Sequence, residues 1–239
     1  MVVAKLESKV ALITGASSGI GQSIVEKLLQ NNIRVIAHYR SHKPDLKRER
    51  LKWVQADFSK NYEVEAMMKE IVQDHRCIDY LVNVASVSED KLFSEIDEND
   101  AQYIYQTNLF SHITIMNKVF SLMKNQCYGR IVTISSIGVK YSGSANTMLY
   151  SSSKCALEAI TRSFAKHGAS FNVNANSVRA GVTDTGFHTD ASKNMEKRVS
   201  MIPMKRMAKP HEIADMAYFL LSSTGDFITG QEYAVSGGE

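Results

Sequence analysis

Short runs of apolar residues alternate along the chain with longer segments in which apolar residues recur every three or four positions. The short runs predict β-strands buried on both faces, and the longer segments predict amphipathic helices. The expected strands are residues 10–14, 34–39, 53–55, 78–84, 130–135, 172–178 and 231–235, and the expected helices are residues 20–29, 62–72, 99–123, 149–167 and 210–221. This alternation predicts a doubly wound α/β fold, with a parallel sheet covered by helices on both faces.

Length and composition agree with one domain of this kind. The chain has 239 residues, of which 44% are hydrophobic and 22% are charged, as is typical of a globular protein that buries its own core. We therefore expect a single domain over residues 1–239. Residues 186–209 lack a regular apolar period, and we expect them to form a flexible flap over a substrate.

The charge pattern disfavours several classes of protein. The 28 Lys and Arg residues nearly balance the 25 Asp and Glu residues, which argues against binding to nucleic acid or to an anionic membrane surface. No apolar run approaches the roughly 18 residues of a membrane-spanning helix. The N-terminal segment carries Lys5, Glu7 and Lys9 where a signal peptide would be apolar, so we expect a cytoplasmic protein without membrane contact.

The cysteines give no sign of a disulfide framework or a metal centre. Cys77, Cys127 and Cys155 are odd in number, lie far apart and form no CxxC motif. We expect reduced, partly buried thiols and no bound metal.

A glycine-rich turn follows the first expected strand and begins the first expected helix. Its sequence is TGASSGIG, residues 14–21. Free backbone N–H groups and the positive end of the helix dipole favour an anion at such a turn, and glycines let a phosphate approach the backbone. The spacing is GxxxGxG and not the general GxGxxG. The strand–turn–helix context nevertheless indicates a site for a dinucleotide pyrophosphate.

The end of the second expected strand indicates which dinucleotide binds. A carboxylate there would bond an adenosine ribose hydroxyl and repel a phosphate, but residues 38–41 read HYRS. Arg40 instead offers a planar, permanently charged guanidinium that suits a phosphate. We therefore expect NADP(H), with NAD(H) as the weaker alternative.

Tyr150 and Lys154 form a YxxxK pattern at the start of an expected helix. Residues four apart share a helix face, so both side chains can reach one site. A nearby ammonium favours the phenolate and brings a phenol closer to the range in which it acts as an acid or base at neutral pH. Ser136 ends the fifth expected strand, where its hydroxyl can bond the carbonyl oxygen that Tyr150 protonates.

Taken together, these motifs resemble the short-chain dehydrogenase/reductase family, in its single-domain type that includes 3-oxoacyl-acyl-carrier-protein reductases. The segments that carry the resemblance occur in family order: TGASSGIG (14–21), Asp57, LVNVAS (81–86), Asn108, ISS (134–136), YSSSK (150–154), AGVTDT (180–185) and ITGQEYAVSGG (228–238). The resemblance implies a seven-stranded, mainly parallel Rossmann sheet and usually a homotetramer. It also implies hydride transfer between a nicotinamide and a carbonyl or secondary alcohol, which is the small-molecule substrate.

The resemblance also implies a role for each matching residue. Tyr150 is the acid/base, Ser136 holds the substrate oxygen, Lys154 binds the nicotinamide ribose, and Asn108 holds a water that relays protons. Asp57 accepts from the adenine, and Thr185 bonds the carboxamide. The catalytic set is Asn108, Ser136, Tyr150 and Lys154. The cofactor set is Gly15, Ser17, Ser18, Gly19, Ile20, Gly21, Arg40, Asp57, Phe58, Asn83, Ala85, Tyr150, Lys154, Gly181, Thr183 and Thr185.

The chain departs from the family pattern at three places. The family's NNAG is NVAS at residues 83–86, and its Pro-Gly after the sixth strand is Ala180-Gly181, which we expect to loosen the nicotinamide loop. The segment between the second strand and Asp57 is short, and any helix in it is expected to be a stub. None of these changes removes a reacting group.

The substrate remains open at this point. Relatives that act on an acyl carrier protein dock it through two arginines, but Cys127 and Phe171 stand at the matching positions. Lys124, Arg130 and Arg162 are the candidates to replace them. An acyl-carrier substrate, a free small carbonyl and a polar, sugar-like substrate of cell-surface glycan biosynthesis all stay possible, as does a non-catalytic NADP(H) sensor.

The expected flap carries several apolar side chains. Met195, Met201, Ile202 and Met204 either contact an apolar substrate or pack against the helix below, and we expect His188 to be solvated.

Overall fold

The computed structural model describes residues 9–88, 91–186 and 195–239. Seven parallel strands form one sheet in the order β3-β2-β1-β4-β5-β6-β7. They are β1 (Val10–Ile13), β2 (Arg34–Tyr39), β3 (Leu51–Gln55), β4 (Tyr80–Asn83), β5 (Gly129–Ser136), β6 (Val173–Ala180) and β7 (Glu232–Val235). The expected doubly wound fold is confirmed, and every strand pair is parallel.

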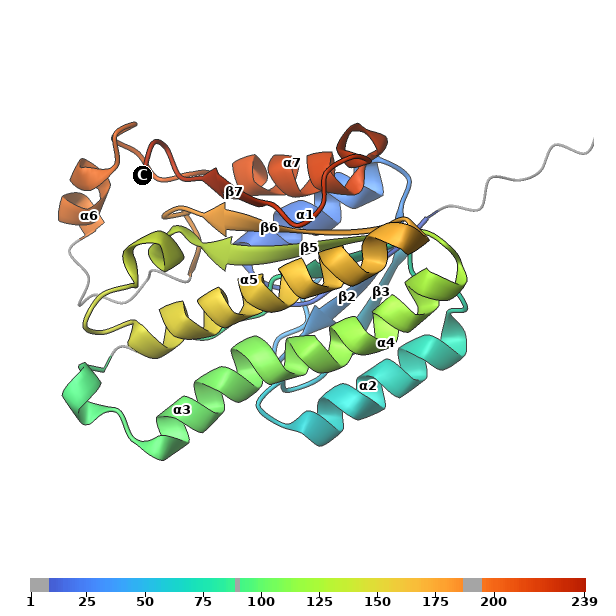
Figure 1. Cartoon of the computed structure of the whole chain (residues 1–239), viewed down its shortest axis with the longest axis horizontal. Coiled ribbons are helices and arrows are strands. Elements are labelled where there is room, and N and C mark those ends of the chain that lie inside the picture. Colours follow the sequence, from blue (N-terminus) through green and yellow to red (C-terminus); the bar gives the residue numbers. More distant parts are fainter. Residues whose placement is uncertain (1–8, 89–90, 187–194) are drawn as a thin grey trace, which may run out of the picture.

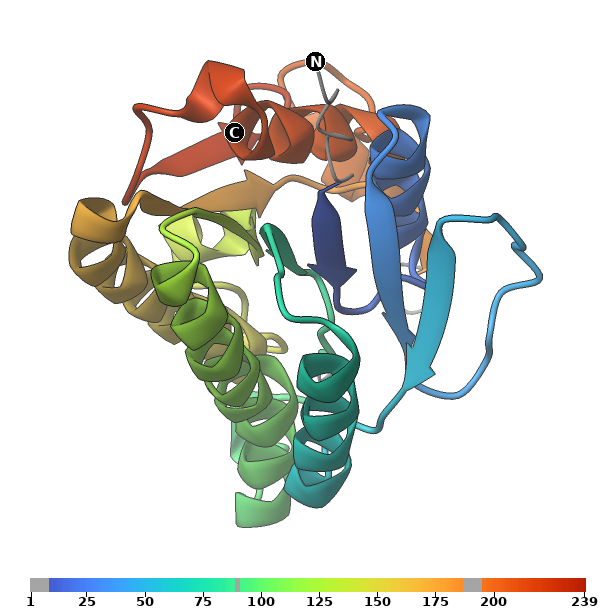
Figure 2. The same ribbon diagram turned by 90° about the vertical axis from the view of Figure 1, so that its right-hand side faces the viewer.

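Helices cover both faces of the sheet (Figures 1 and 2). On one face lie α2 (Asn61–Asp74), α4 (Ser111–Asn125) and α5 (Met148–Gly168), and on the other lie α1 (Gly19–Gln30) and α7 (Pro210–Leu221). Side chains alternate along each strand, so Leu12 packs in the first layer while Ala11 and Ile13 pack in the second. The sheet therefore carries an apolar core on each side, and these two cores hold its carboxyl edge in place.

The helix expected over residues 99–123 is interrupted by a change of helical pitch. α3 (Glu98–Tyr105) passes into a π-helix, η2 (Gln106–Phe110), and then into α4. A π turn inserts an extra residue and commonly marks a functional position. Here it contains Asn108, whose side chain is fully buried.

Short 3-10 segments connect several elements: η1 (Phe93–Glu95), η3 (Ile137–Tyr141), η4 (Ala169–Phe171) and η6 (Ser223–Gly225). The expected flap contains a helix, α6 (Met195–Met201), and the prediction for His188 lies outside the described residues. No helix forms between β2 and β3, so the stub expected in that segment is absent.

All three cysteines are exposed, and the expectation of partly buried thiols is wrong. Cys127 occupies a left-handed turn with φ of 52°, and Cys155 lies on the outer side of α5. None of the helices in the described part of the chain combines the length and the apolarity needed to span a membrane.

Candidate active site

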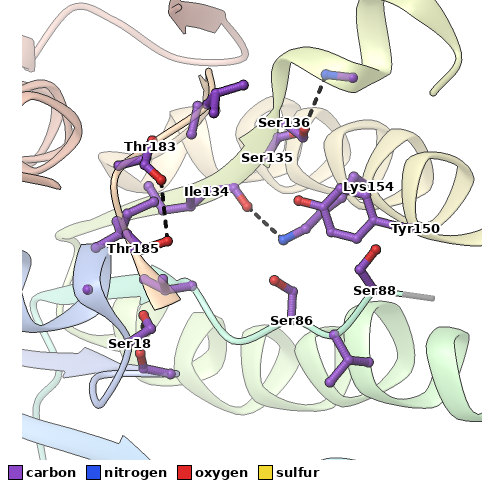
Figure 3. A pocket seen from close by; sticks show the side chains of 18 of the residues that line it. Ser18, Ser86, Ser88, Ile134, Ser135, Ser136, Tyr150, Lys154, Thr183 and Thr185 are labelled. Carbon is purple, nitrogen blue, oxygen red and sulfur yellow. Dashed lines mark hydrogen bonds between the residues drawn. The ribbon is translucent and has the colours of Figure 1, made fainter. Parts of the chain in front are cut away.

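A cavity of about 1420 Å³ opens at the carboxyl edge of the sheet. Its walls come from the loops after β1, β2, β4, β5 and β6, the start of α5, α6, and the residues after β7. Figure 3 shows Ser18 and Thr185 toward one end, Tyr150 and Ser88 toward the other, and Ser86 between them. Because open parallel sheets bind ligands at this edge, the cavity is the candidate site.

The glycine-rich turn between β1 and α1 forms one end of the cavity. Ser18 caps α1: its Oγ accepts from the Gly21 N–H at 3.1 Å and donates to the Gly15 carbonyl oxygen at 2.8 Å. Gly15 has φ of +62°, and a Cβ there would lie 2.7 Å from the Ala85 backbone, so the position requires glycine. Gly19 begins α1, where backbone N–H groups have no acceptor within the helix. The turn therefore presents donors to an anion.

His38 of β2 supports the glycine-rich turn through its imidazole ring, a role that the sequence pattern did not predict. Its Nδ1 accepts from the Gly15 N–H at 3.0 Å, its Nε2 donates to the Ala56 carbonyl oxygen at 2.9 Å, and its ring stacks on Phe58 with centroids 4.1 Å apart. Burial lowers the pKa of His38 to about 4, so the ring is neutral and carries its proton on Nε2. The available signal was a histidine within an otherwise apolar strand.

Arg40 lies just beyond β2, exposed at the rim of the same end. Its guanidinium donates to the Tyr103 hydroxyl at 3.3 Å, and its carbonyl oxygen accepts from the Gln55 amide at 2.8 Å. Lys43 lines the cavity beside it. This rim is basic and suits a phosphate group.

Ser136, Tyr150 and Lys154 meet at the other end of the cavity (Figure 3). Ser136 is the last residue of β5, and its Oγ accepts from the Gly138 N–H at 3.1 Å. Tyr150 and Lys154 are four residues apart on the first turns of α5. The Lys154 Nζ lies 5.9 Å from the centre of the Tyr150 ring and donates to the Ile134 carbonyl oxygen at 2.9 Å.

Lys154 is a buried ammonium with a modified acidity. Its side chain is 2% exposed, and burial lowers its pKa from 10.5 to about 8, while the Glu158 carboxylate opposes this shift. The group is therefore still mostly protonated at neutral pH. A positive charge held beside a phenol stabilises the phenolate, so the pair can act in proton transfer.

Asn108 anchors the loop after β4 and does not line the cavity. Its Oδ1 accepts from the Val87 N–H at 2.8 Å, and its Nδ2 donates to the Val87 carbonyl oxygen at 2.8 Å and to the Ser153 Oγ at 3.1 Å. The loop held in this way carries Ser86 and Ser88. The proton relay expected of Asn108 stays a prediction.

A buried histidine, His112, supports the same loop. His112 of α4 donates from Nε2 to the Ala85 carbonyl oxygen at 2.8 Å, and its Nδ1 lies 3.1 Å from the Asn83 Oδ1. Burial, with a smaller contribution from the Lys154 charge, lowers the pKa of His112 to about 3. His112 thus holds Ala85 of the NVAS sequence at 83–86 from the helix behind it.

The loop after β6 is also tied down, although alanine replaces the family's proline there. The Gly181 N–H donates to the Val235 carbonyl oxygen at 2.9 Å, and a Cβ at Gly181 would lie 2.7 Å from the Ser236 Cα. Thr183 pairs with Ala208 in a parallel bridge. These contacts argue against the loosening that the missing proline led us to expect.

The cavity collects most of the predicted site residues. Those that line it are Gly15, Ser17, Ser18, Gly19, Ile20, Arg40, Phe58, Ala85, Ser136, Tyr150, Lys154, Gly181, Thr183 and Thr185. Gly21, Asp57, Asn83 and Asn108 lie outside the lining. Asp57 Oδ1 accepts from the N–H and the hydroxyl of Ser59, at 3.0 and 2.8 Å, and its role toward an adenine stays a prediction.

Within the described ranges, no three His, Cys, Asp or Glu side chains are grouped to hold a metal ion.

The chain is similar over almost its whole length to known reductases. A family model described as "Enoyl-(Acyl carrier protein) reductase" matches residues 15–239. Acetoacetyl-CoA reductase of Acinetobacter sp. (strain RA3849) is 32% identical over 245 residues, which cover 97% of this chain and 98% of that protein. The 3-oxoacyl-[acyl-carrier-protein] reductase FabG of Aquifex aeolicus (strain VF5) is 32% identical over 250 residues, with 98% of each covered.

Solved structures show the same relationship. The structure titled "ElxO with NADP Bound" matches with a TM-score of 0.87 at 27% identity and covers 96% of this chain and 98% of its own. Ligand-free aldohexose dehydrogenase (AldT) of Thermoplasma acidophilum matches with a TM-score of 0.87 at 27% identity, covering 97% and 93%. The family match, the full-length relatives and the shared fold show that the chain belongs to the short-chain dehydrogenase/reductase family of oxidoreductases.

Proposed function

We propose that this protein is an NADP(H)-dependent oxidoreductase that interconverts a carbonyl and a secondary alcohol, with Tyr150 as acid and base. The observation that carries the proposal is the meeting of Ser136, Tyr150 and Lys154 in the same cavity as the glycine-rich turn. The two ends of the cavity thus combine an anion-binding cradle with a proton-transfer group.

The residues present fit NADP(H). A Cβ at Gly19 would lie 2.7 Å from the Thr185 Cγ2, and one at Gly15 would strike the Ala85 backbone, so glycines keep the cradle open. Arg40 supplies the charge for a phosphate on the adenosine ribose. The solved relative "ElxO with NADP Bound" supports the same assignment. When bound, the dinucleotide supplies or accepts the hydride.

The chain's own residues supply the proton and the orientation. The Ser136 hydroxyl donates to the substrate oxygen, while the Tyr150 phenol donates its proton to that oxygen as a carbonyl becomes an alcohol. The buried Lys154 ammonium stabilises the phenolate that results. In the reverse direction the phenolate takes the alcohol proton.

The names of the relatives favour an acyl thioester as one substrate class, since those reported above act on acetoacetyl-CoA and 3-oxoacyl-acyl-carrier protein. Docking of a carrier protein has less support. Arg130 is 2% exposed and bonds the Asp226 carboxylate at 2.7 Å, so it does not replace a docking arginine as expected. Arg162 is paired with Glu232, which leaves Lys124 as the remaining candidate.

The decisive experiment is Tyr150→Phe. We expect turnover of a carbonyl panel with NADPH to fall at least about a thousandfold, while NADPH binding changes little, because only the proton donor is lost. Tyr62→Phe, at a tyrosine that is 69% exposed and outside the cavity, is the matched control. Turnover retained by Tyr150→Phe would reject the role of the phenol. NADPH binding by the wild type without turnover of any carbonyl would favour the sensor.

We also propose that the protein is a homo-oligomer, and a tetramer by analogy with the family. Exposed aromatic side chains on several elements support this: Phe110 is 50% exposed, Phe171 37% and Phe219 40%. Light scattering on the purified protein tests the assembly, and a monomeric mass would contradict it.

A further inference from the structure

Two residues far apart in sequence form an ion pair in the wall of the cavity, beyond the reacting groups. Arg198 lies on α6 and Glu239 follows β7, and both line the cavity. The Arg198 guanidinium is paired with the Glu239 Oε1. Neither residue belongs to the motifs that carry the family resemblance.

The residues after β7 are fitted tightly against the end of α6. A Cβ at Gly237 would lie 2.9 Å from the Ile202 Cγ2, and one at Gly238 would lie 2.9 Å from the Pro203 Cβ. The Met204 N–H donates to the Gly237 carbonyl oxygen at 3.1 Å. Glycines 237 and 238 also have φ of +67° and +102°, so other residues are excluded there. This packing fixes where Glu239 meets the cavity.

Glu239 contributes an unsatisfied acceptor to the wall. Its side chain is only 9% exposed, and its Oε2 is buried without a hydrogen-bond partner among the described residues. A buried carboxylate oxygen without a donor costs free energy, so the site gains from a ligand that brings one.

The charge of the pair selects the kind of donor. The side-chain charges of Arg198 and Glu239 cancel, so the pair offers no net attraction to an anionic or a cationic group. An alkyl chain leaves Oε2 without a donor. An uncharged hydroxyl donates to Oε2 and can also accept a hydrogen bond from Arg198.

The cavity wall also carries hydroxyl groups that are compatible with such a substrate. Ser86, Ser88, Ser144 and Ser151 line the cavity. We propose that Glu239 and Arg198 are specificity residues, and that the substrate is an uncharged hydroxylated ketone or aldehyde whose hydroxyl donates to Glu239. This inference rests on the proposed carbonyl chemistry and favours a hydroxylated substrate over the acyl thioesters that the names of the relatives suggest.

The test uses two ketones with the same carbon skeleton, erythrulose (1,3,4-trihydroxybutan-2-one) and butan-2-one. The ratio of their kcat/KM values with NADPH is measured for the full-length wild type, Glu239→Ala and Glu239→Gln. Intrinsic reactivity differences between the ketones cancel when ratios are compared among enzymes. We expect the ratio to fall about tenfold or more in Glu239→Ala. Glu239→Gln should give an intermediate ratio, because its amide oxygen still accepts.

Arg206→Met is the matched control, because Arg206 forms a similar ion pair with Glu212 outside the cavity lining. Its ratio should equal that of the wild type. If the two ketones lose activity equally in Glu239→Ala, or if wild type reduces acetoacetyl-CoA or acetoacetate and not erythrulose, the inference is overturned while the proposed function stands. If the wild type binds NADPH but reduces no carbonyl at all, the proposed function itself fails.

Discussion

Glu158 of α5 accepts two hydrogen bonds from the Arg179 guanidinium of β6, at 2.9 and 2.7 Å, one helical turn beyond Lys154. Glu158 is 2% exposed, and its charge opposes the fall in the pKa of Lys154. Arg179 therefore holds a carboxylate that stabilises the Lys154 ammonium.

Glu158→Gln tests this relationship. Loss of the carboxylate charge should lower the pKa of Lys154 further below its ordinary value, so the alkaline limb of the kcat/KM profile moves to lower pH. Stability should fall by about 2 kcal/mol, less than for a fully buried pair, because the Arg179 side chain is 26% exposed. An alkaline limb that stays in place, measured beside the stability loss, would leave Glu158 with a structural role only.

Lys154→Met should abolish turnover and stabilise the fold at neutral pH. Burial depresses the pKa of Lys154 to about 8, which corresponds to about 3 kcal/mol of unfavourable burial, offset in part by the lost bond to the Ile134 carbonyl oxygen. Between pH 8 and 10.5 the lysine of the unfolded chain still holds its proton, whereas the buried Lys154 has lost it. The free energy of unfolding of the wild type therefore rises with pH across this interval.

The measurement is chemical denaturation of both proteins from pH 7 to 10.5. The stability advantage of the methionine variant should shrink across that interval. An advantage that does not change with pH would show that Lys154 does not titrate as described.

His38 should make the fold sensitive to acid. Its folded pKa is about 4 and its ordinary value is 6.5, so the unfolded chain takes up the proton first, and stability falls as pH drops from 6.5 to 4. His112, with a pKa of about 3, acts in the same direction. His38→Leu should be less stable than the wild type. Its free energy of unfolding should nevertheless fall less steeply as the pH drops, by up to about 1.4 kcal/mol per pH unit. His211→Gln, at an exposed histidine of α7, is the comparison, and an equal slope in all three proteins would contradict the assignment.

Arg40→Ala should raise the KM for NADPH about 10- to 100-fold and leave the KM for NADH nearly unchanged, because a charged hydrogen bond to a phosphate is lost. Lys47→Ala removes an exposed positive charge from the same loop outside the main cavity and serves as the control. Equal changes for both coenzymes would refute the discrimination by Arg40.

The periodic signals of the sequence predicted the strands and helices well, since apolar spacing reports burial directly. The glycine-rich turn and the YxxxK pair were also readable, because strand ends and helix turns place them at one edge. What the sequence could not predict depends on tertiary contacts. The burial of Arg130 requires Asp226 and Asn172 from distant loops, and the roles of His38 and His112 require partners that no local pattern reveals.

The π-helix at Gln106–Phe110 was hidden for a related reason. A single change of pitch leaves the apolar stripe on both sides almost intact, so residues 99–123 were interpreted as one helix. The exposure of the cysteines was also missed, because residue type alone favours burial while turn geometry placed Cys127 outside.

The extra residue in that π turn has an evolutionary corollary. Deletion of one residue within 106–110 would restore ordinary α-helical winding, and α4 would keep its length and its amphipathic character. The wider π turn takes up the extra residue within about one turn, so α4 would keep nearly the same rotational position relative to α3 after the deletion. His112 would keep its contact with Ala85, whereas Asn108, inside the turn that changes, would lose the position from which it bonds Val87. A lineage could thus lose the anchor of this loop through an indel that no hydropathy profile would register.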